Sequence, residues 1–171
     1  MDAGRFAHWI VAVQQGMRSG DGNDVPCGGC VACCTSGQLV PVDDDERGGL
    51  PPHAVVDTAE GAVLARTDEG ACLSLADGRC TVYETRPRAC RIYDCRIFAA
   101  TGLEPEEDKP AIREQAKRWR FRVATDEDRR RSEAVRATVV MLRMQQVGGR
   151  PTSTTQLAAR AVLHHDELLQ G

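Results

Sequence analysis

Half of the eight cysteines in this 171-residue chain fall within a single window of eight residues. Cys27, Cys30 and Cys33 form a C-x-x-C-x-x-C pattern, and Cys34 follows directly. This spacing lets successive thiolates of a tight loop converge on one metal centre, while the intervening backbone amides point at the sulfur atoms. Two glycines inside the pattern lower the steric cost of such a loop. Because vicinal side chains diverge, Cys34 is expected to serve a second centre or to bridge two metals.

The other four cysteines come from the segment between residues 72 and 95. The pair Asp77-Gly78 is a strong turn signal, so residues 72–83 are expected to form a β-hairpin with one cysteine on or beside each arm. Pro87 suits the first turn of a short helix that carries the last two cysteines. Eight thiols allow two four-thiolate sites, or one site with spare ligands. The four later cysteines are Cys72, Cys80, Cys90 and Cys95.

The chain lacks the features of an exported or membrane-spanning protein. An acid and a histidine, Asp2 and His8, stand where a signal peptide needs a basic and then an apolar run. No apolar stretch approaches the length of a membrane span. We therefore expect a cytoplasmic protein whose cysteines are metal ligands or reactive thiols, with a disulfide framework as the alternative.

Charge sets requirements on the surroundings of such a centre. Four thiolates leave a net charge of about −2 around Zn²⁺, and also around an oxidised four-iron cluster, so backbone amides or cations must offset it. Arg86 and Arg91 flank Cys90 closely in sequence and are the expected cofactor-binding cations, although surface solubility would also explain them. Eight thiolates with a vicinal pair and nearby arginines favour an iron–sulfur cluster or iron slightly over zinc.

The joint pattern of cysteines and neighbouring residues resembles the CxxCxxCC family, also called the YkgJ-type cysteine-cluster proteins, over roughly residues 25–100. The resemblance implies metal chelation by seven of the cysteines, and it links the chain to peptide modification, because a related cysteine domain occurs in flagellin lysine N-methylases. It leaves Cys95 less defined, because Asp94 precedes it where family members often carry proline. The residues of the resemblance are Cys27, Cys30, Cys33, Cys34, Gly70, Cys72, Cys80, Val82, Tyr83, Glu84, Arg86, Pro87, Cys90, Arg91 and Tyr93.

Charge and periodicity divide the chain into three parts. Residues 1–24 predict a helix from Asp2 to Arg18 followed by a loop, with Phe6, Ile10 and Val13 on one helix face. Residues 1–108 hold 18 acidic and 9 basic side chains, and within them residues 25–108 form the expected cysteine module, with short strands at 38–42 and 62–67. Residues 109–171 are mostly helical, with 12 basic and 5 acidic side chains between 109 and 150. The predicted fold class is α+β: an irregular, metal-organised cysteine module with short β-hairpins, flanked by N- and C-terminal helices.

The basic helical region is expected to pack on the cysteine module, to bind a protein or peptide, or to form a homodimer interface. Helix starts are expected at Thr125 and at Ser153 or Thr154. The helix from Thr125 is expected to end at residues 148–151 and to bury one apolar face, which consists of Ala134, Val135, Thr138, Val139, Leu142 and Val147. A surface or capping role is expected for His164 and His165. Nucleic-acid binding is not expected, because the whole chain is acidic and no stacking aromatics accompany the basic run.

The sequence therefore predicts a cysteine-cluster protein that holds iron or zinc. With iron, it would serve redox chemistry or assist the modification of a peptide or small molecule. The alternative is a non-enzymatic zinc-stabilised adaptor or metal carrier that docks a partner. No pattern identifies a catalytic residue, so enzymatic activity stays open.

Overall fold

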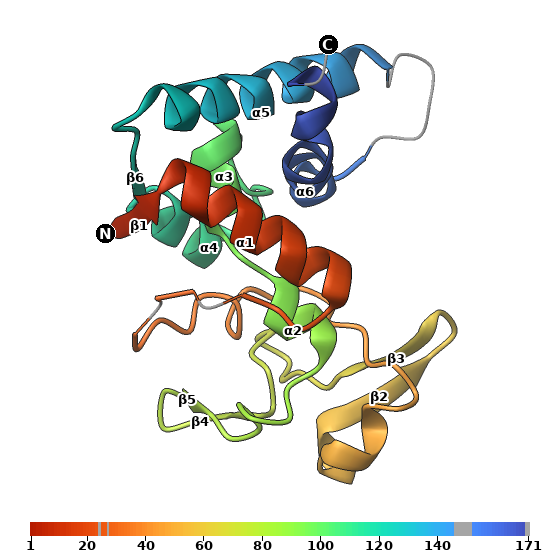
Figure 1. Ribbon diagram of the computed structural model, residues 1–171. Helices are drawn as coiled ribbons and strands as arrows, with labels where there is room; N and C mark the ends of the chain where they lie inside the picture. Colours follow the sequence, from red (N-terminus) through yellow and green to blue (C-terminus); the bar gives the residue numbers. More distant parts are fainter. Residues whose placement is uncertain (24, 27, 146–151, 170–171) are drawn as a thin grey trace. The chain divides into compact units, whose positions relative to one another are not determined.

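The computed structural model describes residues 1–23, 25–26, 28–145 and 152–169, and Figure 1 shows its helices and strands. Two compact units make up the chain. One comprises Met1–Gln15 together with Asp94–Gly171 and is called the helical unit here. The other, Gly16–Tyr93, is called the cysteine unit. Short strand pairs and flanking helices confirm the predicted α+β class.

The helical unit contains most of the longer elements. Its elements are β1 (Asp2–Arg5), the first part of α1 (Phe6–Ser19), α3 (Arg96–Thr101), α4 (Pro110–Ala116), β6 (Arg120–Arg122), α5 (Asp126–Gln145), α6 (Thr154–His164) and the 3-10 helix η3 (His165–Leu168). The predicted stripe on α1 is buried, with Phe6, Ile10 and Val13 at most 1% exposed. Trp119, Val135 and Val162 complete the apolar core.

The chain start differs from the prediction of a helix from Asp2. Residues 2–5 form a strand that pairs in parallel with β6, with Asp2 opposite Arg120 and Arg5 opposite Arg122. The backbone N–H of Arg120 donates to the carbonyl of Met1 at 3.0 Å. Gly4 has a φ of +89°, which L side chains rarely adopt, so the helix begins only at Phe6.

Both predicted caps of the later helices are present. The Thr125 hydroxyl accepts from the N–H of Asp128 at 3.2 Å, in the first turn of α5. Ser153 forms a capping box with Gln156 at the start of α6. The predicted apolar face of α5 is buried from Ala134 to Leu142, whereas Val147 and the predicted stop at 148–151 lie outside the described residues.

The cysteine unit is built from short elements. They are the end of α1, η1 (Arg47–Gly49), η2 (Pro52–Ala54), β2 (Val55–Thr58), β3 (Gly61–Leu64), β4 (Leu75–Ala76), β5 (Arg79–Cys80) and α2 (Arg88–Ile92). The antiparallel pair β4–β5 turns at Asp77 and Gly78, both with positive φ, as predicted. The predicted strand at 38–42 is reduced to a bridge between Pro41 and Val63, because proline offers no N–H to a ladder.

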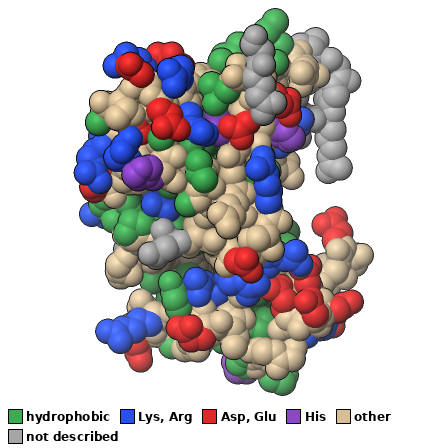
Figure 2. Space-filling view, viewed as in Figure 1, with side chains coloured by type: hydrophobic (Ala, Val, Ile, Leu, Met, Phe, Trp, Pro, Cys, Tyr) green, Lys and Arg blue, Asp and Glu red, His purple; other side chains and the backbone are tan. Residues whose placement is uncertain are grey.

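No helix in the described part of the chain has the length and apolar character needed to cross a membrane. Charges of both signs mix on the surface of each unit. Figure 2 shows blue and red side chains together over the end of the helical unit that carries β1, β6 and the start of α5. Ion pairs account for this mixture, such as Arg129 with Asp126 and Arg131 with Glu127.

Candidate metal centre

Four cysteines from three separate segments meet at the apolar core of the cysteine unit. Cys72 belongs to this core and is 7% exposed. Cys34, Cys80 and Cys90 are half-buried and pack against the same core. We call these four residues the thiol cluster. The core residues that surround it are Val40, Val42, Leu50, Ala62, Leu64 and Val82.

Backbone hydrogen bonds set the position of each member. The N–H of Cys72 donates to the carbonyl of Cys34 at 2.7 Å. This hydrogen bond joins the loop that holds Cys30, Cys33 and Cys34, called the front loop here, to the hairpin segment. Within the hairpin, the pairing of Leu75 with Cys80 brings Cys80 back toward Cys72. Cys90 lies in α2, where its N–H donates to the carbonyl of Pro87 at 2.9 Å. Pro87 lies at the cap position just before this helix and not in its first turn as predicted, and the helix ends at Ile92, so it carries Cys90 but not Cys95.

The front loop curls tightly around its cysteines. The carbonyl of Val31 accepts from the N–H groups of Cys34 and Thr35, at 2.9 and 3.1 Å. Cys30 and Cys33 are half-buried, and Cys30 is near enough to Cys34 to affect its ionisation. Cys27 lies outside the described residues.

The thiol cluster is costly to ionise without a cation. Burial, then the neighbouring Cys72 and Cys80, raises the pKa of Cys34 to about 11. Burial, then Cys34 and Cys72, raises the pKa of Cys90 to about 12. Both effects have the same origin, since thiolates in an apolar setting lose hydration and repel one another.

Two arginines offset part of this cost. Arg86 lowers the pKa of Cys90, as expected for a cation beside a thiol, and its guanidinium stacks over the Tyr83 ring at 3.8 Å. Arg66 acts on Cys34 in the same way, and it donates to the carbonyls of Cys34 and Gly70 at 3.4 and 2.9 Å. The sequence analysis missed Arg66, because it is 32 residues from Cys34 and no local pattern marks it.

The guanidinium of Arg91, the other predicted cofactor-binding cation, donates hydrogen bonds to oxygen atoms of two other residues. It donates to the carbonyl of Arg86 at 2.6 Å and to the carboxylate of Glu46 at 3.2 Å. Its part at a metal stays a prediction.

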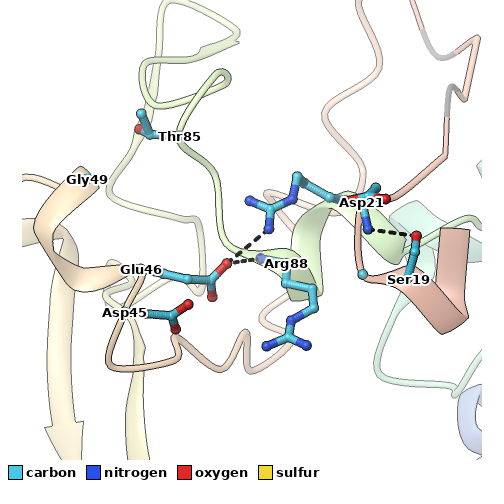
Figure 3. Close-up of a pocket in the computed structure, with 9 residues that line it drawn as sticks. Ser19, Asp21, Asp45, Glu46, Gly49, Thr85 and Arg88 are labelled. Atoms are coloured by element: carbon cyan, nitrogen blue, oxygen red, sulfur yellow. Dashed lines mark hydrogen bonds and ion pairs between the residues drawn. The ribbon is translucent and has the colours of Figure 1, made fainter.

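A polar pocket of about 330 Å³ lies beside α2. Figure 3 shows Glu46 reaching from the loop before η1 to the backbone N–H of Arg88, a hydrogen bond of 2.6 Å. The other Glu46 oxygen accepts from the N–H of Asp43 at 3.2 Å. Glu46 therefore holds both the start of α2 and Arg91. The sequence analysis missed it as well, since it is more than 40 residues from these partners.

The eighth thiol, Cys95, lies in the helical unit. It is 5% exposed, and the indole N–H of Trp119 donates to its sulfur at 3.2 Å. Its neighbours Asp94 and Arg96 form a buried ion pair at 2.7 Å. Its assignment as a metal ligand stays a prediction.

The predicted surface or capping role of the two histidines takes a different form in each, because His164 lies on the surface whereas His165 stands at the C-terminal cap position of α6. His164 pairs with Glu167 at 2.9 Å on the surface. His165 is fully buried, with its Nδ1 at 2.8 Å from the Val162 carbonyl and 3.3 Å from the Gln14 amide. The chain turns from α6 into η3 at this point, which directs the ring inward.

The donor set of the cysteine unit fits a soft, thiophilic metal. Thiolates are preferred ligands of zinc and of iron–sulfur clusters, and an apolar surround with nearby arginines reduces their net charge. In the part of the chain that the structure describes, no three Cys, His, Asp or Glu side chains are placed closely enough to hold an ion as they stand. Closing a coordination shell would therefore draw the thiols together.

A family model for the CxxCxxCC domain, described as a "putative zinc- or iron-chelating domain", matches residues 26–120. No curated protein and no solved structure matches the chain.

Proposed function

We propose that this chain, which belongs to the CxxCxxCC family, binds iron or zinc through the thiol cluster and the front-loop cysteines of its cysteine unit. One observation carries the proposal: cysteines from a loop, a hairpin and a helix pack against one apolar core. Ordinary buried cysteines would have no reason to gather in this way. A metal bound there would join three segments that share few backbone hydrogen bonds.

The proposed ligands are the four members of the thiol cluster together with Cys27, Cys30 and Cys33. Arg86 and Arg66 would offset thiolate charge, and Arg91 would hold the helix of Cys90 in place. A bound iron centre would supply electron exchange, whereas a closed zinc site would supply structural stability alone. We take iron ahead of zinc because seven thiols that include a vicinal pair suit a centre with more than one metal.

With iron, the protein would serve redox chemistry or assist the modification of a peptide or small molecule. A zinc-stabilised adaptor or metal carrier is the second candidate. Exposed apolar side chains on α5 favour it, since Val140 and Met144 are 58% and 71% exposed. Such side chains often mark a surface that docks a partner.

Elemental analysis of protein purified without oxygen tests the proposal. We expect stoichiometric iron with visible absorbance, or stoichiometric zinc with a colourless protein. Iron and zinc both far below one equivalent per chain would contradict the proposal.

Replacement of single cysteines tests the ligands. Cys72→Ser, Cys30→Ser and Cys33→Ser are each expected to release metal and to lower soluble yield sharply, because metal binding and folding are coupled. Cys95→Ser is the comparison, since its thiol lies in the helical unit. Metal loss in Cys95→Ser would assign the eighth thiol to the centre. Unchanged metal content and Tm in the other three variants would reject their assignment.

A further inference from the structure

We propose that the helical unit carries a binding pocket for a small organic molecule with an apolar body and a carboxylate group. The pocket is a cavity of about 660 Å³ lined by α3, α4, β6, the first residue of α1 and the middle of α5. This volume lies within the range of about 300–1,000 Å³ that is usual for small-ligand sites. All of its lining residues belong to the helical unit, so the proposal is independent of the metal centre.

The floor of the pocket is aromatic. Phe6, Phe98 and Trp119 line it and are at most 2% exposed. The Phe6 ring packs edge-on against Phe121 with a centroid distance of 5.0 Å. Val123 lines the same cavity and is 47% exposed. An apolar body placed there would cover the exposed side chain of Val123 and the half-buried ring of Phe121, which is favourable.

The lining carries four cations and one anion. The cations are Arg113, Lys117, Arg120 and Arg136, and the anion is Glu104. Lys117 is paired with Glu114 at 2.9 Å, and Arg120 donates to the carbonyls of Lys117 and Trp119. Arg136 is exposed and has no hydrogen bond or ion pair with any residue that the structure describes. The excess of positive charge favours an anionic ligand.

Arg113 gives the strongest indication of the ligand's chemistry. Its Nε is buried and has no hydrogen-bond partner among the described residues. Nε forms an ion pair with the exposed Glu104 carboxylate at 3.6 Å, which is longer than a hydrogen bond, and Nη2 donates to the carbonyl of Pro105 at 3.1 Å. A buried donor without an acceptor is costly. A carboxylate matches the planar fork of a guanidinium, so a ligand carboxylate would satisfy this donor.

Calorimetric titration of the purified full-length protein with dodecanoate, below its micelle concentration, tests the proposal, with dodecanol as the uncharged probe of equal length. We expect saturable binding of one equivalent of dodecanoate and at least tenfold weaker binding of dodecanol. Arg113→Gln with Arg136→Gln is expected to weaken dodecanoate binding by about tenfold or more, which corresponds to roughly 1.4 kcal/mol. Arg130→Gln, an exposed arginine of α5 that does not line the pocket, is the matched control and should bind as the natural chain does.

Val123→Asp adds a second readout that does not depend on Arg113. The side chain is exposed, so the variant should fold, and its carboxylate should repel the ligand and abolish binding. Equal binding of dodecanoate and dodecanol would overturn the proposal. So would the absence of saturable binding, or arginine variants that bind as tightly as Arg130→Gln.

Discussion

Glu46 is the side chain through which the acidic loop of the cysteine unit meets the helix that carries Cys90. One oxygen accepts from the N–H of Arg88 and from the Arg91 guanidinium, and the other accepts from the N–H of Asp43. Only 11% of the side chain is exposed. Its loss would remove a shared acceptor from the N–H of Arg88 and from the half-buried Arg91 guanidinium, and hydrogen bonds to a charged group contribute more than a simple surface ion pair.

Glu46→Gln removes the charge and replaces one acceptor oxygen by an amide donor. We expect it to lower the free energy of unfolding by about 1.5–3 kcal/mol, the usual value for hydrogen bonds to a charged group. Urea denaturation of the metal-loaded protein measures this. Asp45→Asn is the matched control, because Asp45 is the exposed neighbour in the same pocket. If the two variants had the same free energy of unfolding, Glu46 would not stabilise the contact between the acidic loop and α2.

At the residue scale, type and spacing alone predict the candidate ligands, and the assignment of Cys95 among them stays a prediction. Glu46 and Arg66 could not be predicted, because their partners lie more than 30 residues away and only the folded chain brings them together.

Among the elements, α5 depends on one buried carboxylate at its first turn. Asp128 is fully buried and accepts from the N–H of Ala7 at 2.9 Å, from the N–H and hydroxyl of Thr125 at 2.9 and 2.8 Å, and from Arg5 at 3.3 Å. The hydrogen bond from Ala7 is the largest cause that holds the pKa of Asp128 far below its usual range. This carboxylate therefore joins the first turn of α1 to the first turn of α5.

Asp128→Asn is expected to lower Tm at neutral pH by at least about 2–4 °C, the shift that roughly 1 kcal/mol produces in a chain of this size. Since the folded pKa is depressed, the stability that the carboxylate contributes is fully present above the ordinary carboxyl pKa of about 3.9. It is lost as the pH falls from there through the folded pKa. The difference in Tm between natural chain and variant should therefore be constant from pH 7 to about pH 5 and shrink below about pH 4.

Thermal scans across this pH range measure the effect. Asp126→Asn is the control, because Asp126 lies in the same first turn with its side chain 80% exposed. A Tm difference for Asp128→Asn that does not change at low pH would contradict an ionised, hydrogen-bonded carboxylate.

The elements that local chemistry determines were the ones predicted well. The Asp77-Gly78 turn, the start of α2 after Pro87 and the two caps at Thr125 and Ser153 all follow from neighbours in sequence. The parallel pair of β1 and β6 was missed, because its partners are about 118 residues apart and β6 has only three residues. Periodicity alone cannot reveal so short a strand.

At the scale of the whole molecule, the division into two units implies that removal of the metal should destabilise the cysteine unit more than the helical unit. The seven proposed ligands belong to the cysteine unit, whereas the helical unit has an aromatic and aliphatic core of its own. We expect removal of the metal by a chelator to raise amide hydrogen exchange in residues 28–93 by tenfold or more. Exchange in α5 and α6 should change little.

Hydrogen exchange followed by mass spectrometry, with and without chelator and then after metal is restored, measures this. Recovery of protection with metal serves as the control for irreversible unfolding. An equal rise of exchange in both units would show that the chain loses its structure as one cooperative body.

The helical unit is assembled from two distant pieces of the chain, because residues 1–15 pack with residues 94–169. The cysteine unit is continuous in sequence, and along the chain it comes between these two pieces. On the ribosome, the stretch that holds Cys30 to Cys90 emerges before α5 and α6 have been synthesised. Phe6, Ile10 and Val13 must therefore wait, still uncovered, for their partners. The order of synthesis thus gives the thiols access to metal first, and it makes the nascent N-terminal helix the segment most in need of protection by a chaperone.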